Sequence, residues 1–274
     1  MDGCNADLGL PDLSLQEAKA KGVKTLVIGV ANRGGIISPA WKKVLVQALE
    51  EGFDLASGLH NLLRDEPDLK AVAEATGRSL HDVRVPAVKY PIANGIKRSG
   101  KRCLAVGTDC SVGKMYTALC MEKEMRARAM KATFRATGQT GILITGNGVP
   151  LDAVIADFIA GAAESLTIEA AAEADIVLVE GQGSIIHPAY SGVTLGLMHG
   201  ALPHAMVLCA QPSRTTIHRN PWVPIPSLSE MIRLYESAME PLRPSPVIAI
   251  ALNTFDLDDR EAREAIERAR AETG

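Results

Sequence analysis

The strongest chemical signal in the chain is the segment Gly107-Thr108-Asp109-Cys110-Ser111-Val112-Gly113-Lys114. It follows a predicted strand, residues 102–106, and opens a predicted helix that extends to about residue 128. Glycines let backbone N–H groups turn toward an anion, the helix N-terminus adds partial positive charge, and Lys114 adds a full charge. This pattern predicts a phosphate-binding P-loop.

Two departures from the usual P-loop pattern affect which anion it binds. Five residues separate Gly107 from Gly113, where the usual pattern has four. Met115 follows the lysine, where a Ser or Thr usually ligates Mg²⁺. The sequence therefore supports anion binding by residues 107–115 better than it supports hydrolysis of a Mg-nucleotide.

Two carboxylates are expected on the same side of the sheet as this loop. Asp109 lies within the P-loop, and Glu180 follows the predicted strand 176–179. In open sheets of parallel strands, ligands gather at the carboxyl ends of the strands. We therefore expect both side chains near the ligand.

The elements that position these residues alternate between strand and helix, which predicts an α/β fold with parallel sheets. We predict a Rossmann-like N-terminal domain over residues 1–85, a linker over 86–101 and a P-loop domain with an NTPase-like parallel sheet over 102–274. Capping boxes at Ser14–Glu17 and Ser227–Glu230 mark two helix starts. A long Ala-rich helix is expected over 151–172, and buried strands are expected at 25–30 and 247–252.

Composition restricts the possible partners. The 274 residues carry 29 basic and 32 acidic side chains, a net charge of -3, and only 4% aromatics, so a nucleic-acid partner is not expected. No apolar run approaches the ~20 residues of a membrane helix. Five scattered cysteines without CxxC spacing are typical of a reducing compartment, so we expect a cytoplasmic protein with no metal site.

Two resemblances extend this interpretation. The P-loop and the segment Val179-Glu180-Gly181-Gln182-Gly183-Ser184 resemble dethiobiotin synthetase, which implies an ATP- and Mg²⁺-dependent ligase in which Asp109 and Glu180 hold metal. The whole chain is more similar to a bacterial family once described only as a domain of unknown function with a P-loop. That resemblance is carried by residues 27–32, 107–114, 135–141 and 179–188, and it implies a D-glutamate N-acetyltransferase.

The second resemblance assigns a role to further residues. It implies that residues 107–115 bind the phosphates of acetyl-CoA, and that Glu180 or His187 takes a proton from the attacking amine. A glutamate acceptor carries two carboxylates, for which we predict Arg135, Gln139 and Arg214 as substrate-binding residues. Besides the ligase and the N-acetyltransferase, a third hypothesis is a non-enzymatic module that senses a nucleotide or CoA. Homo-oligomers are common, so a homo-oligomer that binds small molecules is expected.

Overall fold

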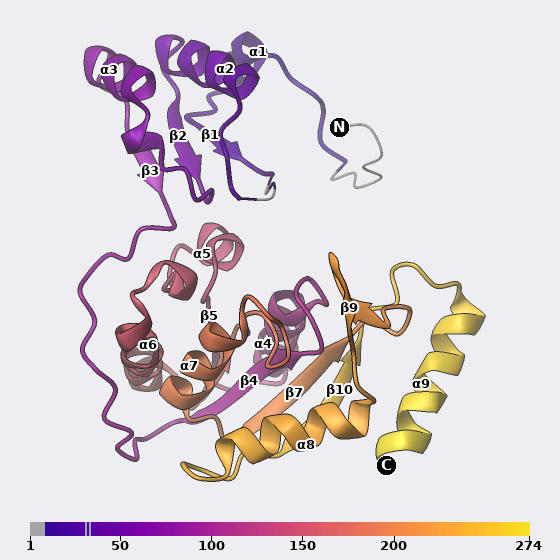
Figure 1. Ribbon diagram of the computed structural model, residues 1–274. Coiled ribbons are helices and arrows are strands. Elements are labelled where there is room, and N and C mark those ends of the chain that lie inside the picture. The colour runs from indigo at the N-terminus through magenta and orange to yellow at the C-terminus, as the bar shows by residue number, and fades with distance from the viewer. Residues whose placement is uncertain (1–8, 31, 33) are drawn as a thin grey trace. The chain divides into compact units, whose positions relative to one another are not determined.

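The chain forms two compact units, Met1–Arg84 and Val85–Gly274, each with its own sheet. The computed structural model describes residues 9–30, 32 and 34–274 (Figure 1). Ala31, in the N-terminal segment that carries the family resemblance, lies outside the described residues. No helix within the described ranges is long and apolar enough to cross a membrane.

The N-terminal unit is a small sheet of three parallel strands in the order β1-β2-β3. Leu45, Leu49, Leu55 and Leu69 form the centre of its core. The elements in chain order are α1 (Leu15–Ala20), β1 (Thr25–Ile28), α2 (Pro39–Glu50), β2 (Asp54–Ser57), a 3₁₀ turn at Leu63–Asp65, α3 (Pro67–Thr76) and β3 (Leu80–Asp82).

The C-terminal unit contains a parallel sheet of five strands in the order β10-β7-β4-β6-β5. Before its first strand, residues 85–100 contain no helix or strand. The elements are β4 (Lys101–Gly107), α4 (Lys114–Ala127), β5 (Ala132–Arg135), α5 (Gln139–Thr145), α6 (Ile159–Glu173), β6 (Ile176–Val179), α7 (Ser191–Ala201), β7 (Ala205–Ala210), β8 (Thr216–Ile217), β9 (Asn220–Pro224), α8 (Leu228–Met239), β10 (Val247–Leu252) and α9 (Asp259–Thr273).

Side chains alternate between the two faces of the five-stranded sheet, and around β4 each face contributes to a core. Leu104 and Val106 of β4 point into a core shared with α6, α7 and α8. Cys103 and Ala105 point into a second core on the α4 side. The carboxyl end of β4 is thereby held in the middle of the sheet, where the P-loop begins.

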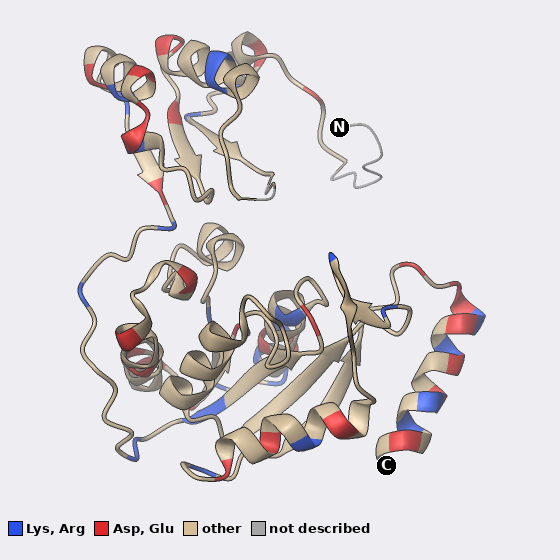
Figure 2. Ribbon diagram, in the orientation of Figure 1, with Lys and Arg blue, Asp and Glu red and all other residues tan. Residues whose placement is uncertain are grey.

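The structure confirms several local predictions. Ser14 and Ser227 each close a capping box with the glutamate three residues later. In addition, the structure has salt bridges along α4 between Glu122 and Arg126 and between Glu124 and Arg128. Figure 2 shows how opposite charges also alternate along α9, where Arg260 pairs with Glu264.

Other predictions were wrong. The long helix expected over 151–172 is divided into two 3₁₀ turns and α6. Strands β1 and β10 were expected to be covered on both faces. Val27 is 50% exposed and Ile248 is 63% exposed, since both strands lie at the edge of their sheets.

Helices α6 and α7 pack so closely that a glycine is required where they cross. A Cβ placed on Gly200 would lie 2.0 Å from the backbone oxygen of Ala160. A Cβ on Gly192 in the same helix would meet nothing within 4 Å.

The two glycines give a matched pair of variants for thermal unfolding. We expect Gly200→Ala to lower the free energy of unfolding by about 1–3 kcal/mol, because the helices must move apart. Gly192→Ala should leave it unchanged or raise it by roughly 0.5–1 kcal/mol, because alanine is the better helix former. A Gly200→Ala protein as stable as the Gly192→Ala protein would contradict the close crossing.

Candidate functional site

The P-loop joins β4 to α4, as the sequence predicts. Ser111 (φ 54°) and Gly113 (φ 102°) adopt left-handed backbone conformations that turn the chain into the helix. Lys114 is the first residue of α4 and is only 6% exposed. Its Nζ donates a hydrogen bond to the backbone oxygen of Asp109 at 2.7 Å, which holds the lysine across the loop.

Asp109 is a residue of the P-loop, and its side chain is fully buried. Its Oδ2 accepts hydrogen bonds from Arg214 Nη1 at 3.0 Å and from the backbone N–H of His218 at 2.7 Å. Its Oδ1 accepts one from the N–H of Cys110 at 2.6 Å. Arg214 also donates to the backbone oxygen of Cys110 at 2.7 Å. The Asp109 carboxylate and Arg214 therefore hold the P-loop backbone in place through hydrogen bonds.

Glu180 is held in one orientation at the carboxyl end of β6. Its Oε2 accepts hydrogen bonds from the backbone N–H groups of Thr137 at 2.8 Å and Gly138 at 3.1 Å. Burial raises the pKa of Glu180 to about 7, although these hydrogen bonds and the nearby charge of Lys114 act in the opposite direction. A carboxylate with such a pKa can accept a proton at neutral pH.

A cavity of about 450 Å³ joins the P-loop to Glu180. It brings together many of the predicted site residues, namely Cys110, Ser111, Gly113, Lys114, Met115, Gln139 and Glu180. The remaining predicted residues of the P-loop do not line the cavity, namely Gly107, Thr108, Asp109 and Val112. Val112 is buried in the core beside α4.

His187 faces Asp109 and does not line this cavity. Its Nδ1 accepts a hydrogen bond from the backbone N–H of Ala189 at 3.1 Å, so the neutral ring carries its proton on Nε2. That nitrogen lies 4.0 Å from Asp109 Oδ1. Burial lowers the pKa of His187, which favours this neutral form. Nδ1 is thus engaged with the backbone outside the cavity, and Nε2 faces Asp109 at a distance longer than a hydrogen bond.

The structure does not bring Arg135 or Arg214 to the cavity, although both were predicted to bind a substrate carboxylate. The Arg135 guanidinium turns back along β5, donates to Thr133 Oγ1 at 2.7 Å and forms an ion pair with Glu173 on α6. Arg214 is committed to Asp109. Of the three predicted substrate residues, only Gln139 lines the cavity.

Tyr235 is a positioning residue that sequence reasoning missed. Its buried hydroxyl on α8 donates to the backbone oxygen of Gly107 at 2.7 Å and accepts from the N–H of Ile185 at 3.1 Å. It thereby ties the start of the P-loop to the segment after Glu180. The available signal was a tyrosine on the apolar face of an amphipathic helix, because a buried phenol needs a polar partner.

Ligand atoms of Asp109, Cys110 and His187 lie within 4.8 Å of one another, the spacing of a metal-binding group. The Asp109 carboxylate already pairs with the Arg214 guanidinium. A divalent cation bound there would be close to that positive charge. The donor set therefore fits a metal poorly.

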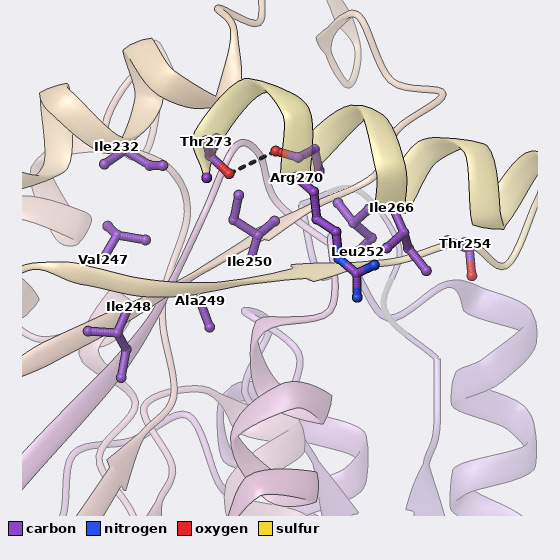
Figure 3. A pocket seen from close by; sticks show the side chains of 12 residues that line it. Ile232, Val247, Ile248, Ala249, Ile250, Leu252, Thr254, Ile266, Arg270 and Thr273 are labelled. Atoms are coloured by element: carbon purple, nitrogen blue, oxygen red, sulfur yellow. Dashed lines mark hydrogen bonds between the residues drawn. The ribbon is translucent and has the colours of Figure 1, made fainter.

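A groove between β10 and α9, lined mostly by residues of apolar type and with a volume of about 580 Å³, lies elsewhere in this unit (Figure 3). Ile250, Leu252 and Ile266 line it, and Arg270 is its one charged lining residue. The groove lacks a group that can exchange protons near pH 7. The P-loop cavity is therefore the stronger candidate for chemistry.

Comparisons with known proteins agree with this architecture. Residues 1–86 match a family model described as a domain of unknown function (DUF1611_N), Rossmann-like domain. Residues 91–274 match one described as a domain of unknown function (DUF1611_C), P-loop domain.

Two curated relatives carry the name D-glutamate N-acetyltransferase. The relative from Tritonibacter scottomollicae is 64% identical over 96% of this chain and 79% of its own length. The relative from a Pseudoalteromonas species is 43% identical over 98% of this chain and 81% of its own length.

A crystal structure of a DUF1611 family protein from Anabaena variabilis has a TM-score of 0.90 and 41% identity. The match covers 95% of this chain and 77% of that chain. Together with the two curated relatives and the matches to both domain models, it shows that the chain belongs to the DUF1611 family, with a Rossmann-like N-terminal domain and a P-loop C-terminal domain.

Proposed function

We propose that this chain is a D-glutamate N-acetyltransferase with acetyl-CoA as the acetyl donor. The observation that carries the proposal is the cavity in which the Glu180 carboxylate, fixed by two backbone N–H groups, lies close to the buried Lys114. The names of the curated relatives support the same reaction class and acceptor.

In this proposal Glu180 is the general base. An amine must lose a proton as it attacks a thioester, and a base works best when its pKa lies near the working pH. Glu180 lines the cavity and has a pKa of about 7. The Nδ1 of His187 accepts a backbone hydrogen bond, so its role in the proposal is to support Asp109 and the P-loop.

The alternative is a ligase or kinase-like enzyme that uses Mg-ATP. Met115 provides no hydroxyl for Mg²⁺, and both oxygens of Asp109 already accept hydrogen bonds from the protein. These two observations make acetyl transfer the better supported reaction.

We further infer a cytoplasmic, homo-oligomeric enzyme that acts on small molecules, with neither nucleic acid nor membrane as a partner. Cys103, Cys110, Cys120 and Cys209 are free thiols, which agrees with a reducing compartment. The net charge of -3 provides no basic field to attract nucleic acid. The homo-oligomer follows only from the frequency of symmetric assemblies.

The first prediction concerns the reaction itself. Purified protein with acetyl-CoA should release free CoA thiol when D-glutamate is added, measured with a thiol-reactive dye. N-acetylglutamate should be identified by mass spectrometry. L-glutamate and Mg-ATP serve as the comparison substrates. Formation of ADP from Mg-ATP without any release of CoA thiol would replace this proposal with the ligase.

The second prediction concerns Glu180. Glu180→Gln keeps a similar shape but removes the base, so kcat should fall by roughly 10²–10⁴-fold. In the wild type, kcat/KM should decrease as the pH falls through about 7, because protonated Glu180 cannot accept a proton. The variant should lack this acidic limb.

Glu124→Gln is the matched control, since Glu124 pairs with Arg128 on the exposed side of α4. Its rate and pH profile should equal those of the wild type. A Glu180→Gln protein that retains full turnover would exclude Glu180 as the base.

A further inference from the structure

The P-loop cavity presents two opposite charges to a single small ligand. Lys114 and Glu180 both line it, and each is at most 6% exposed. Burial raises the pKa of Glu180, and the charge of Lys114 acts against that rise, so the two groups interact electrostatically. A pyrophosphate would be attracted by one group and repelled by the other. An amino acid carries a carboxylate for the lysine and an amine for the glutamate.

The length of CoA adds a second constraint. Its pantetheine arm places about twelve covalent bonds between the pyrophosphate and the sulfur, as many as the backbone of about four residues, and so spans roughly 14 Å when extended at ~3.5 Å per residue. The oxygen of a general base must lie within about 2.6–3.2 Å of the nitrogen that bears the proton, or reach that nitrogen through one water. If the CoA phosphates occupied the P-loop, Glu180 would lie near the phosphates and far from the thioester of an extended arm. Phosphate binding by Lys114 and base catalysis by Glu180 therefore exclude each other for an extended CoA.

We propose that the P-loop cavity is the acceptor site, in which a carboxylate of the amino acid binds Lys114 and the N-terminus of α4 while its amine lies at Glu180. This proposal rests on the proposed function. It replaces the sequence-based prediction that residues 107–115 bind the CoA phosphates.

Amide groups are available for the second carboxylate of an acidic amino acid. Gln139 lines the cavity at the start of α5, and its side-chain NH₂ can donate hydrogen bonds. Gln182 lines it as well, with its Nε2 donating to Thr137 Oγ1 at 3.1 Å. The cavity thus matches a dicarboxylic amino acid with one cation, one base and the amides of Gln139 and Gln182.

The transfer step balances with these groups. The amine nitrogen forms a bond to the thioester carbonyl carbon, and the amine proton passes to Glu180. The carbon–sulfur bond breaks, and CoA leaves as a thiolate with the electron pair. Protonation of the thiolate gives the free thiol that the assay detects.

The variant Lys114→Ala tests the proposal through two Michaelis constants. Loss of a charge-assisted contact should raise the KM for D-glutamate by about tenfold to hundredfold and leave the KM for acetyl-CoA unchanged. Lys123→Ala is the matched control, because Lys123 is exposed on the same helix. A higher KM for acetyl-CoA with an unchanged KM for D-glutamate would overturn the proposal.

A truncated donor gives an independent measure. The ratio of kcat/KM for acetyl-CoA to that for acetyl-pantetheine, which lacks the nucleotide, should be the same in the wild type and in Lys114→Ala. If the P-loop bound the phosphates, the variant would lose most of its preference for acetyl-CoA, and the proposal would fail.

If the Lys114→Ala variant is folded but inactive, calorimetric titration measures its binding of CoA and of D-glutamate directly. Lys114→Ala should bind CoA with the affinity of the wild type and should bind D-glutamate about tenfold to hundredfold more weakly; the reverse pattern would overturn the proposal. A wild-type protein that releases no thiol with D-glutamate would refute the proposed function instead. The titration with D-glutamate would still decide whether the P-loop cavity binds this amino acid.

Discussion

The geometry of the P-loop depends on the buried carboxylate of Asp109. A buried carboxylate without hydrogen-bond donors would be strongly destabilising, and here the donors are Arg214, the N–H of His218 and the N–H of Cys110. These groups come from the P-loop itself, from the segment between β7 and β8, and from the turn of the β8–β9 hairpin. Lys114 is positioned through the same residue, because its Nζ donates to the backbone oxygen of Asp109. The loop is therefore specified by contacts that are distant in sequence.

This origin explains which parts of the site could be predicted. The spacing from Gly107 to Lys114 is a local property, and it correctly indicated a strand, a loop and a helix. The placement of Glu180 followed from the rule for the carboxyl ends of parallel strands. The direction of a long side chain is decided by its neighbours. Arg135 turns away because Thr133 and Glu173 accept its hydrogen bonds, and the sequence near Arg135 carries no sign of Glu173.

Helices α5 and α7 were not predicted from the sequence, and the reason again lies in tertiary contacts. Helix α7 contains three glycines within eleven residues, a composition that favours a loop. In the structure, Gly200 is required because the backbone of Ala160 approaches it closely. Helix α5 is short and begins after Gly138, so its apolar residues show no clear period. Strand β10 is as apolar as an interior strand, and only the strand order shows that it lies at the edge. In each case the deciding information is a tertiary neighbour.

The chain is divided into two units, each with a separate core, so we expect each unit to unfold cooperatively on its own. A single melting temperature is then not well defined for the whole chain. A ligand that binds only the folded C-terminal unit stabilises that unit by mass action and leaves the intrinsic stability of the other core unchanged. The unfolding of residues 9–84 can thus serve as an internal reference in a calorimetric scan, against which occupancy of the P-loop cavity is read within one molecule.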